Sequence, residues 1–359
     1  MKTKHYLLIF ILLALAAASS ACTGNRMVAS GWAGVTADED TAYLAFNNHV
    51  IAIDLDNGNQ RWQYPAEPDT KVTFYAAPVL TGDGQIIVGG YDNVLYSLNP
   101  ANGQVNWTFK EAQGRYIGSP LVTETGIYAP STDKKLYALD FSGSPIWNEP
   151  FQTDEPLWAR PSTDSECDCV YLASMDHLVY AIDAQSGDEL WRTADLGGAI
   201  VSTPIISADH VLYIGTFANQ LVALNADTGG ELWRFATQDW VWASPALDGD
   251  TLYFGDLSGK FYAVDRNNGQ VNWQIQPDGS IVGMPLVTED GIYFTTEEGS
   301  LISVTTDGAI RWNQSFDESL HAGPVAAGDL ILVASSQPEN LLIAIDANGV
   351  QKWSFGLEK

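Results

Sequence analysis

Basic residues are scarce in this chain: 17 lysines and arginines stand against 44 aspartates and glutamates, which gives a formal net charge of −27 over 359 residues. A nucleic-acid partner needs a basic face that neutralises phosphates, so this balance argues against one. Three cysteines are too few for a disulfide scaffold, and stability must come from burial of apolar residues. A hydrophobic fraction of 46% is enough for a large core and excludes wholesale disorder.

Long hydrophobic runs are also rare, and the one that stands out lies at the start of the chain. Residues 6–18 are uncharged, follow two lysines and lead into Ser19-Ser20-Ala21-Cys22. This layout is typical of a secretory signal, and the run is short for a membrane span. The small residues before Cys22 resemble a bacterial lipobox, in which the cysteine is lipidated. We therefore predict a lipoprotein-type signal peptide over residues 1–21 and a linker over residues 22–28, with ordinary secretion as the alternative.

Tryptophan, in contrast, is abundant, and eight of the 12 tryptophans recur at intervals of 39 to 45 residues. They are Trp62, Trp107, Trp147, Trp191, Trp233, Trp273, Trp312 and Trp353. A period near 40 residues indicates a solenoid, an array or a propeller. Each unit holds four short runs of branched and aromatic residues, separated by Gly, Asn and Asp, with no helical period.

This pattern predicts an all-β fold, with residues 29–357 forming a single eight-bladed β-propeller of four-stranded antiparallel blades. The tryptophan lies on the outermost strand of every blade and fills the gap to the neighbouring blade. The third strand ends in Asp or Asn, and a glycine follows before the tryptophan strand. These turn residues serve hydrogen bonding and positive φ, so we assign them no chemistry.

The repeated signature carries a resemblance to a known family. It runs apolar-Ser-Pro, Tyr-x-Gly, Leu-Tyr-Ala-Leu-Asp and Thr-Gly-x-x-x-Trp, as in Leu136-Tyr137-Ala138-Leu139-Asp140. This resembles the pyrroloquinoline-quinone-like propeller repeat, and eight repeats behind a lipoprotein signal resemble the BamB-type lipoproteins. The resemblance implies docking on the outer-membrane β-barrel assembly machinery.

Catalytic constellations are absent from the pattern. In quinoprotein dehydrogenases, adjacent cysteines stack on the quinone, whereas Cys167 and Cys169 are separated by one residue at a hairpin tip. We expect a local disulfide or two thiols there. The five histidines show no ligand spacing, and acidic pairs such as Glu297-Glu298 fall in turns. We predict no catalytic residue, no metal site and no cofactor.

Candidate binding residues lie where the blades differ. Counted back from the proline of the innermost strand, the fourth position is apolar and the second is small, while the third varies between blades. Strand alternation turns this third position toward the channel mouth. Tryptophan and arginine are frequent at interaction hot spots. We predict a partner-binding rim of Tyr75, Trp158, Arg160, Trp240, Trp242 and His321, with a simple aromatic plug of the channel as the alternative.

These observations together predict a protein-interaction scaffold that is not an enzyme. Cys22 anchors it on the extracytoplasmic side of a membrane, in the outer membrane and periplasm or at the cell surface. Its partner is a protein of the cell envelope, in a BamB-like role in outer-membrane protein assembly. The alternatives are a quinone-binding dehydrogenase and a propeller that binds a small ligand or polysaccharide.

Overall fold

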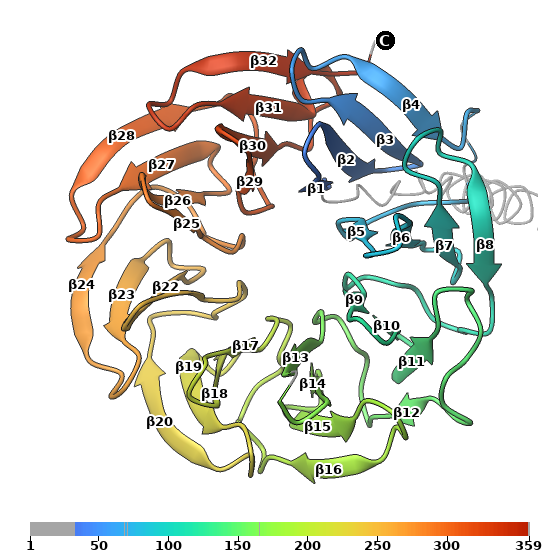
Figure 1. Cartoon of the computed structure of the whole chain (residues 1–359). Coiled ribbons are helices and arrows are strands. Elements are labelled where there is room, and N and C mark those ends of the chain that lie inside the picture. The colour runs from blue at the N-terminus through green and yellow to red at the C-terminus, as the bar shows by residue number, and fades with distance from the viewer. Residues whose placement is uncertain (1–32, 68, 70, 165, 358–359) are drawn as a thin grey trace, which may run out of the picture. The chain divides into compact units, whose positions relative to one another are not determined.

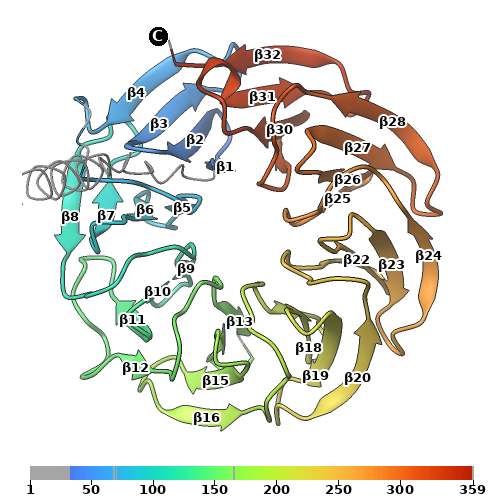
Figure 2. The same cartoon turned by 180° about the vertical axis from the view of Figure 1, so that it is seen from behind.

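The computed structural model describes residues 33–67, 69, 71–164 and 166–357. These residues form eight four-stranded antiparallel sheets that follow one another around a ring, which confirms the eight-bladed propeller (Figures 1 and 2). The predicted signal peptide, Cys22, the linker and Trp32 lie outside the described residues. Within these ranges, no helix has the length and hydropathy needed to cross a membrane.

Each blade is built from four consecutive strands. Blade one comprises β1 (Gly34–Ala37), β2 (Thr41–Phe46), β3 (His49–Asp54) and β4 (Gln60–Tyr64); blade two, β5 (Val79–Leu80), β6 (Ile86–Gly89), β7 (Leu95–Leu98) and β8 (Val105–Phe109); blade three, β9 (Leu121–Val122), β10 (Ile127–Pro130), β11 (Lys135–Leu139) and β12 (Phe151–Gln152); blade four, β13 (Ser162–Asp164), β14 (Cys169–Ala173), β15 (Val179–Asp183) and β16 (Glu189–Arg192). Blade five comprises β17 (Ile205–Ile206), β18 (Val211–Thr216), β19 (Gln220–Asn225) and β20 (Glu231–Ala236); blade six, β21 (Ala246–Asp248), β22 (Thr251–Gly255), β23 (Phe261–Asp265) and β24 (Val271–Ile275); blade seven, β25 (Leu286–Thr288), β26 (Gly291–Thr295), β27 (Ser300–Val304) and β28 (Ile310–Ser315); blade eight, β29 (Val325–Ala327), β30 (Leu330–Ala334), β31 (Leu342–Ile345) and β32 (Gln351–Phe355).

The two middle strands of a blade are apolar along their length because neighbouring blades cover both of their faces. In blade six, for example, β22 is buried from Leu252 onward, and four residues of β23 are buried. The outermost strand has one face toward solvent, and its residues alternate, as in the exposed and half-buried positions of β20. The innermost strands line the middle of the ring in Figure 1, and the tryptophan strands form its circumference.

The turn between the third and fourth strands has the chemistry that the sequence predicts. In blade four, Asp183 Oδ1 accepts hydrogen bonds from the backbone N–H groups of Gln185 and Ser186, at 3.1 and 2.7 Å. The bond from Ser186 lowers the pKa of this carboxyl. In blade seven, Thr305 stands in place of the Asp or Asn, and its Oγ1 accepts from the N–H of Ala309 at 3.0 Å. These polar side chains are therefore structural.

Each framework tryptophan joins its blade to the next through two contacts, which we call the tryptophan clasp. The indole ring lies against the turn glycine of the following blade, and its Nε1–H donates to a backbone carbonyl beside that glycine. Trp191 shows both contacts: a Cβ on Gly229 would lie 2.5 Å from its ring, and its N–H donates to Ala226 O at 2.9 Å. Gly229 has φ +70°, a conformation that glycine adopts without strain. All eight framework tryptophans make both contacts.

The ring closes through the same contact. Trp353 of blade eight donates to Leu55 O of blade one at 2.7 Å, across 298 residues of sequence, and its ring lies against Gly58. Residues of blades one and eight share one hydrophobic cluster. No strand is exchanged between these blades, since blade one holds β1 to β4 in order. Among the described residues, the ring is thus closed by direct contact between blades one and eight.

Blade three differs from the prediction that every framework tryptophan lies on an outermost strand. Trp147 does not lie on the outermost strand, because β12 is only Phe151–Gln152. Pro145 and Pro150 flank the tryptophan and lack the N–H groups that strand pairing needs. Trp147 is nevertheless 5% exposed and donates to Ala184 O at 3.0 Å. The clasp therefore forms without a regular strand.

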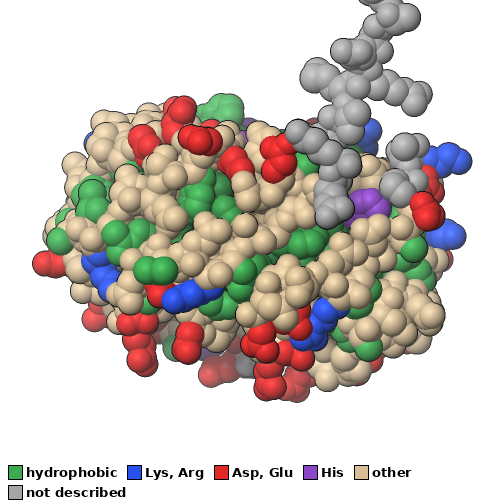
Figure 3. All heavy atoms as spheres, turned by 90° about the horizontal axis from the view of Figure 1, so that it is seen from above, with side chains coloured by type: hydrophobic (Ala, Val, Ile, Leu, Met, Phe, Trp, Pro, Cys, Tyr) green, Lys and Arg blue, Asp and Glu red, His purple; other side chains and the backbone are tan. Residues whose placement is uncertain are grey.

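Acidic side chains are distributed over the surface. On the side shown in Figure 3, they are scattered, with a few basic side chains between them. Many of them belong to turns, where they accept hydrogen bonds, as Asp38 does from Thr41 N at 2.8 Å. A spread of like charge favours solubility more than a local docking patch.

The clasp predicts that Gly229→Ala destabilises the propeller by at least about 2 kcal/mol more than Gly249→Ala. Both glycines have positive φ, but a Cβ on Gly249 meets no atom within 4 Å, whereas one on Gly229 meets Trp191. Gly249→Ala therefore measures the backbone strain alone, about 1–2 kcal/mol. Urea unfolding of the two variants gives the difference, and equal losses would show that the ring contact contributes nothing.

Candidate functional site

The residues that precede each blade's proline lie in the loops between blades, and this corrects their assignment to the innermost strand. The innermost strands begin directly after the proline, as β13 does after Pro161 and β17 after Pro204. Proline has no N–H to donate to a sheet, so pairing starts beyond it. The predicted alternation of side chains persists in these loops: Leu157 and Ala159 are fully buried, whereas Trp158 is partly exposed.

The fourth position before the proline is buried in all seven blades that have this pattern. Its residues are Phe74, Tyr116, Leu157, Ile200, Val241, Ile281 and Leu320. The second position is crowded by the neighbouring loop: a Cβ on Gly118 would lie 2.5 Å from the carbonyl oxygen of Trp158. Larger side chains are therefore excluded there, whereas the third position, between these two, varies from blade to blade.

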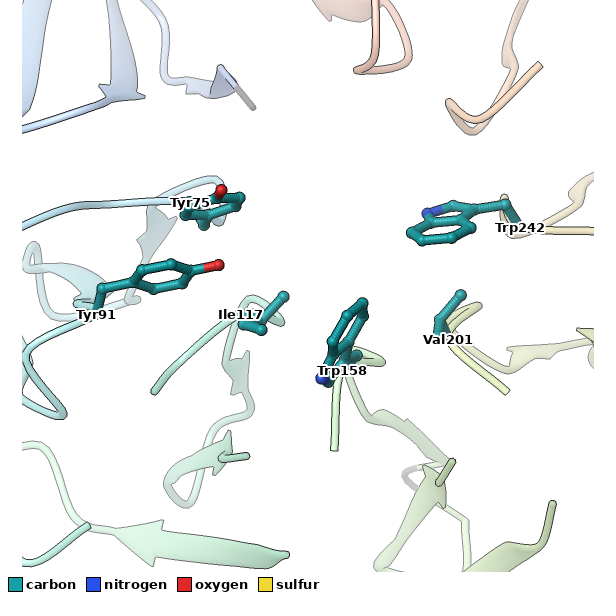
Figure 4. Close-up of a pocket in the computed structure, with 6 residues that line it drawn as sticks. All are labelled: Tyr75, Tyr91, Ile117, Trp158, Val201 and Trp242. Carbon is teal, nitrogen blue, oxygen red and sulfur yellow. The ribbon is translucent and has the colours of Figure 1, made fainter. Parts of the chain in front are cut away.

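The variable position lines a cavity of about 400 Å³ in the middle of the ring. Five consecutive blades contribute one residue each, and the sixth lining residue, Tyr91, comes from the β6–β7 turn. Figure 4 shows Trp158 and Trp242 facing the same space, with Tyr75 and Tyr91 on another side of it. The remaining lining residues are Ile117 and Val201. We call the loops and turns around this cavity the rim face.

Stacked rings hold one wall of the cavity in place. Tyr75 and Tyr91 are parallel, with centroids 4.2 Å apart. The guanidinium of Arg115 lies over Tyr91, 4.8 Å from the ring centroid, in a cation–π contact. Burial raises the pKa of Tyr91, and the hydrogen bond with Tyr75 raises it further. Tyr91 is therefore a neutral hydroxyl group at physiological pH.

A second aromatic stack extends from the cavity outward. Phe217, in the β18–β19 turn, lies 5.1 Å from the ring of Trp242 and stacks on Trp240 at 4.5 Å. Trp240 is 43% exposed and does not line the cavity. The apolar surface thus runs without a break from the cavity, over Phe217, to an exposed indole.

Arg160 and His321, the two remaining rim residues of the sequence prediction, have different surroundings. Arg160 is solvent-exposed, yet burial among the surrounding protein lowers its pKa, and no acidic group offsets this effect. It makes no hydrogen bond or ion pair with another described residue. His321 lies outside the cavity lining, and its Nδ1 is 3.2 Å from Glu297 Oε1 of blade seven.

Two aromatic residues at or near the cavity do not occupy the variable position before a proline, so the sequence pattern did not predict them. Tyr91 and Phe217 occupy the turn between the second and third strands of blades two and five. Their signal in the sequence is an aromatic residue in a turn where other blades have Asn47, Thr132 or Glu297. Which loop such a residue contacts depends on how the blades are packed.

The cysteine pair lies on the opposite face, with Cys167 in the β13–β14 turn and Cys169 at the start of β14. Cys167 and Cys169 form a disulfide, with an S–S distance of 1.96 Å. Beside it, His210 of blade five lies among carboxylates of two blades. Its Nε2 is 3.1 Å from Glu166, and its Nδ1 is 3.3 Å from Asp164 and 3.5 Å from Asp227. This cluster links two neighbouring blades through charge.

The side chains that line the cavity provide an apolar binding surface and no catalytic group. Indole, phenol and aliphatic groups stack and exclude water, but none of them is an activated nucleophile or a base. Among the described residues, no group of three His, Cys, Asp or Glu side chains is placed to hold a metal ion. The arrangement is suited to binding an apolar or aromatic group beside a cation.

The fold and its repeat define this chain as an eight-bladed propeller of the quinoprotein-like class. The family model described as outer membrane protein assembly factor BamB matches residues 15–157, 153–280 and 277–359. The chain belongs to this family.

Individual relatives are distant. The outer membrane protein assembly factor BamB of Bordetella pertussis is 24% identical over 180 residues, 47% of this chain and 45% of that protein. The same factor of Taylorella asinigenitalis is 26% identical over 143 residues, 36% of this chain and 35% of that protein. The putative dehydrogenase XoxF of Paracoccus denitrificans is 31% identical over 115 residues, 29% of this chain and 18% of that protein. The chain thus aligns with less than half the length of each of these relatives.

Solved structures share the fold. The crystal structure of BamB from Moraxella catarrhalis superimposes with a TM-score of 0.69 at 17% identity, covering 84% of this chain and 90% of that one. The computationally designed Ika8 protein gives a TM-score of 0.74 at 12% identity, with 91% and 96% covered. A designed protein fits as well as a natural one, so this likeness concerns architecture alone.

The cluster around His210 predicts a pH-dependent stability. The hydrogen bond with Glu166 and the charges of Asp164 and Asp227 raise the pKa of His210 in the folded protein. The stabilisation is therefore fully present below the unfolded-state pKa, about 6.5, and is lost as the pH rises through the folded-state pKa. The urea midpoint of wild type should exceed that of His210→Gln at about pH 5.5, and the difference should shrink by about pH 8.5.

Asp164→Asn with Glu166→Gln provides the control, because it leaves His210 in place and removes the charges from blade four. This double variant should lose most of the same pH-dependent part of the midpoint, because only Asp227 remains beside His210. If His210→Gln kept the full pH dependence of wild type, the cluster would not be its source.

Proposed function

We propose that this protein is an exported, lipid-anchored scaffold that docks a protein partner of the cell envelope through its rim face. The role we propose is in outer-membrane protein assembly. The observation that carries the docking role is the aromatic cavity, to which five consecutive blades each contribute the variable residue of one loop. Membership of the BamB family and the names of the relatives support the assembly role.

Export and anchoring rest on the beginning of the sequence. The basic start, the apolar run over residues 6–18 and the small residues before Cys22 support a signal peptide whose cleavage leaves a lipidated cysteine. A diacyl anchor would hold the protein at a membrane surface without a spanning helix. The net charge of −27 works against contact of the propeller itself with anionic lipid.

The residues of the rim face favour binding of a partner protein over an enzymatic reaction. The aromatic rings of this face are held by stacking, so little side-chain freedom is lost when a partner binds. Buried aromatic anchors with a neighbouring arginine are the residue types that dominate protein interfaces. A dehydrogenase remains the second candidate function, favoured by the local similarity to XoxF over 115 residues. Reduction of a dye by purified protein with an alcohol would support that candidate.

The docking role predicts that the double variant Trp158→Ala, Arg160→Glu loses its envelope partner. The two residues are two positions apart on one loop, and removing a hot-spot pair of this kind costs at least about tenfold in affinity. Affinity purification of the protein from native membranes, followed by quantification of co-purified proteins, measures the loss.

The matched control is Leu232→Ala, Arg234→Glu, which truncates an apolar side chain to alanine and reverses an arginine charge at the same spacing on β20. Leu232 is 53% exposed on the circumference, away from the cavity lining. The control should retain the partner, and both variants should keep the circular dichroism spectrum of wild type. A rim variant that recovers the same partners as wild type would refute docking through this face.

A further inference from the structure

Apolar and polar side chains are unevenly distributed around the rim face. Blades two to six contribute aromatic and aliphatic side chains to the cavity, and the corresponding residues of blades seven and eight are Val282 and His321. Val282 is 8% exposed, and His321 faces the carboxylate of Glu297. The apolar surface therefore occupies one side of the ring, and an acidic group borders its other side.

Arg160 supplies the positive charge on the apolar side. It follows Trp158 by two positions, and Ala159 between them is fully buried, so alternation places the guanidinium on the same side of the loop as the indole. Trp158 lines the cavity. Arg160 is exposed and makes no hydrogen bond or ion pair with another described residue, so an incoming carboxylate can pair with it without displacing another group.

The shape of the apolar surface favours an extended occupant over a compact one. The cavity of about 400 Å³ has room for a large side chain, and the surface continues outward from Trp242 over Phe217 to Trp240. A compact small molecule in the cavity would leave Trp240 exposed. A peptide chain can fill the cavity with one side chain and cover the outer stack with the next residues.

We propose that the rim cavity binds an extended peptide segment of a partner, which places an aromatic side chain between Trp158 and Trp242 and a carboxylate on Arg160. This rests on the proposed docking function and specifies the chemistry of the partner. The aromatic side chain stacks on indole rings that are already in place, and the carboxylate pairs with a guanidinium that has no acidic partner among the described residues.

The test uses short capped peptides with a fluorophore at one end. One carries a tryptophan and an aspartate two positions later, the second has asparagine for the aspartate, and the third has alanine for the tryptophan. Fluorescence anisotropy with the wild-type protein should show tightest binding for the first peptide. Replacing the aspartate or the tryptophan should weaken binding by about tenfold each.

A double-mutant cycle assigns the carboxylate to Arg160. In Arg160→Gln, the aspartate and asparagine peptides should bind equally, so the tenfold preference disappears. Lys110→Gln removes a positive charge at an exposed residue outside the cavity lining and should keep the preference. Trp158→Ala should weaken binding of the first peptide and leave that of the alanine peptide unchanged.

Equal binding of the aspartate and asparagine peptides to wild type would overturn this inference, as would the absence of binding by any peptide. Either result leaves the docking function standing if the rim variant still loses its envelope partner. Conversely, peptide binding together with an unaffected partner in the rim variant would refute the docking function and retain the peptide site. The two failures are therefore distinguishable.

Discussion

The contact between one indole ring and one glycine of the next blade is the interaction on which the whole ring depends. It needs three things at once: a tryptophan at the edge of one sheet, a glycine at positive φ in the neighbouring turn, and a carbonyl oriented toward the indole N–H. Each clasp buries an aromatic side chain, which is worth about 2–3 kcal/mol. Because the last blade makes this contact with the first, every blade has two neighbours and none has an open face.

The contacts that stabilise the ring and the residues that form the binding cavity lie in different parts of each blade. The clasps lie at the third-to-fourth-strand turns, whereas the cavity lies at the loops between blades, on the other end of the strands. The loop positions on either side of the cavity residues are held buried or small by the adjacent blades, whereas the cavity position itself can change without loss of packing. Trp158 and Trp242 occupy such positions. A repeated framework can thus carry a binding surface that differs from blade to blade.

The propeller fold and the variable loop position could be predicted from the sequence, because both depend on short-range patterns that recur from blade to blade. The spacing of the tryptophans, the Asp or Asn before the glycine, and the alternation of buried and variable loop positions are all short-range patterns. Tyr91 and Phe217 were not predicted as site residues, because their role depends on contacts between separate loops, which the sequence period does not reveal. The same is true of His210, whose three carboxylates come from the β13–β14 hairpin of blade four and the β19–β20 turn of blade five. Trp147 kept its partner while its strand was lost, since two prolines affect hydrogen bonding but not the reach of the indole.

Each blade is made from an uninterrupted stretch of chain, and the first and last blades meet only through side-chain and backbone contacts. No blade therefore needs a particular place in the order of synthesis. A gene that joined Phe355 to Gly34 by a short linker and began at another loop between blades would encode the same eight sheets and the same eight clasps. The ring has no structural first blade, and circular permutation should be tolerated at its interblade loops.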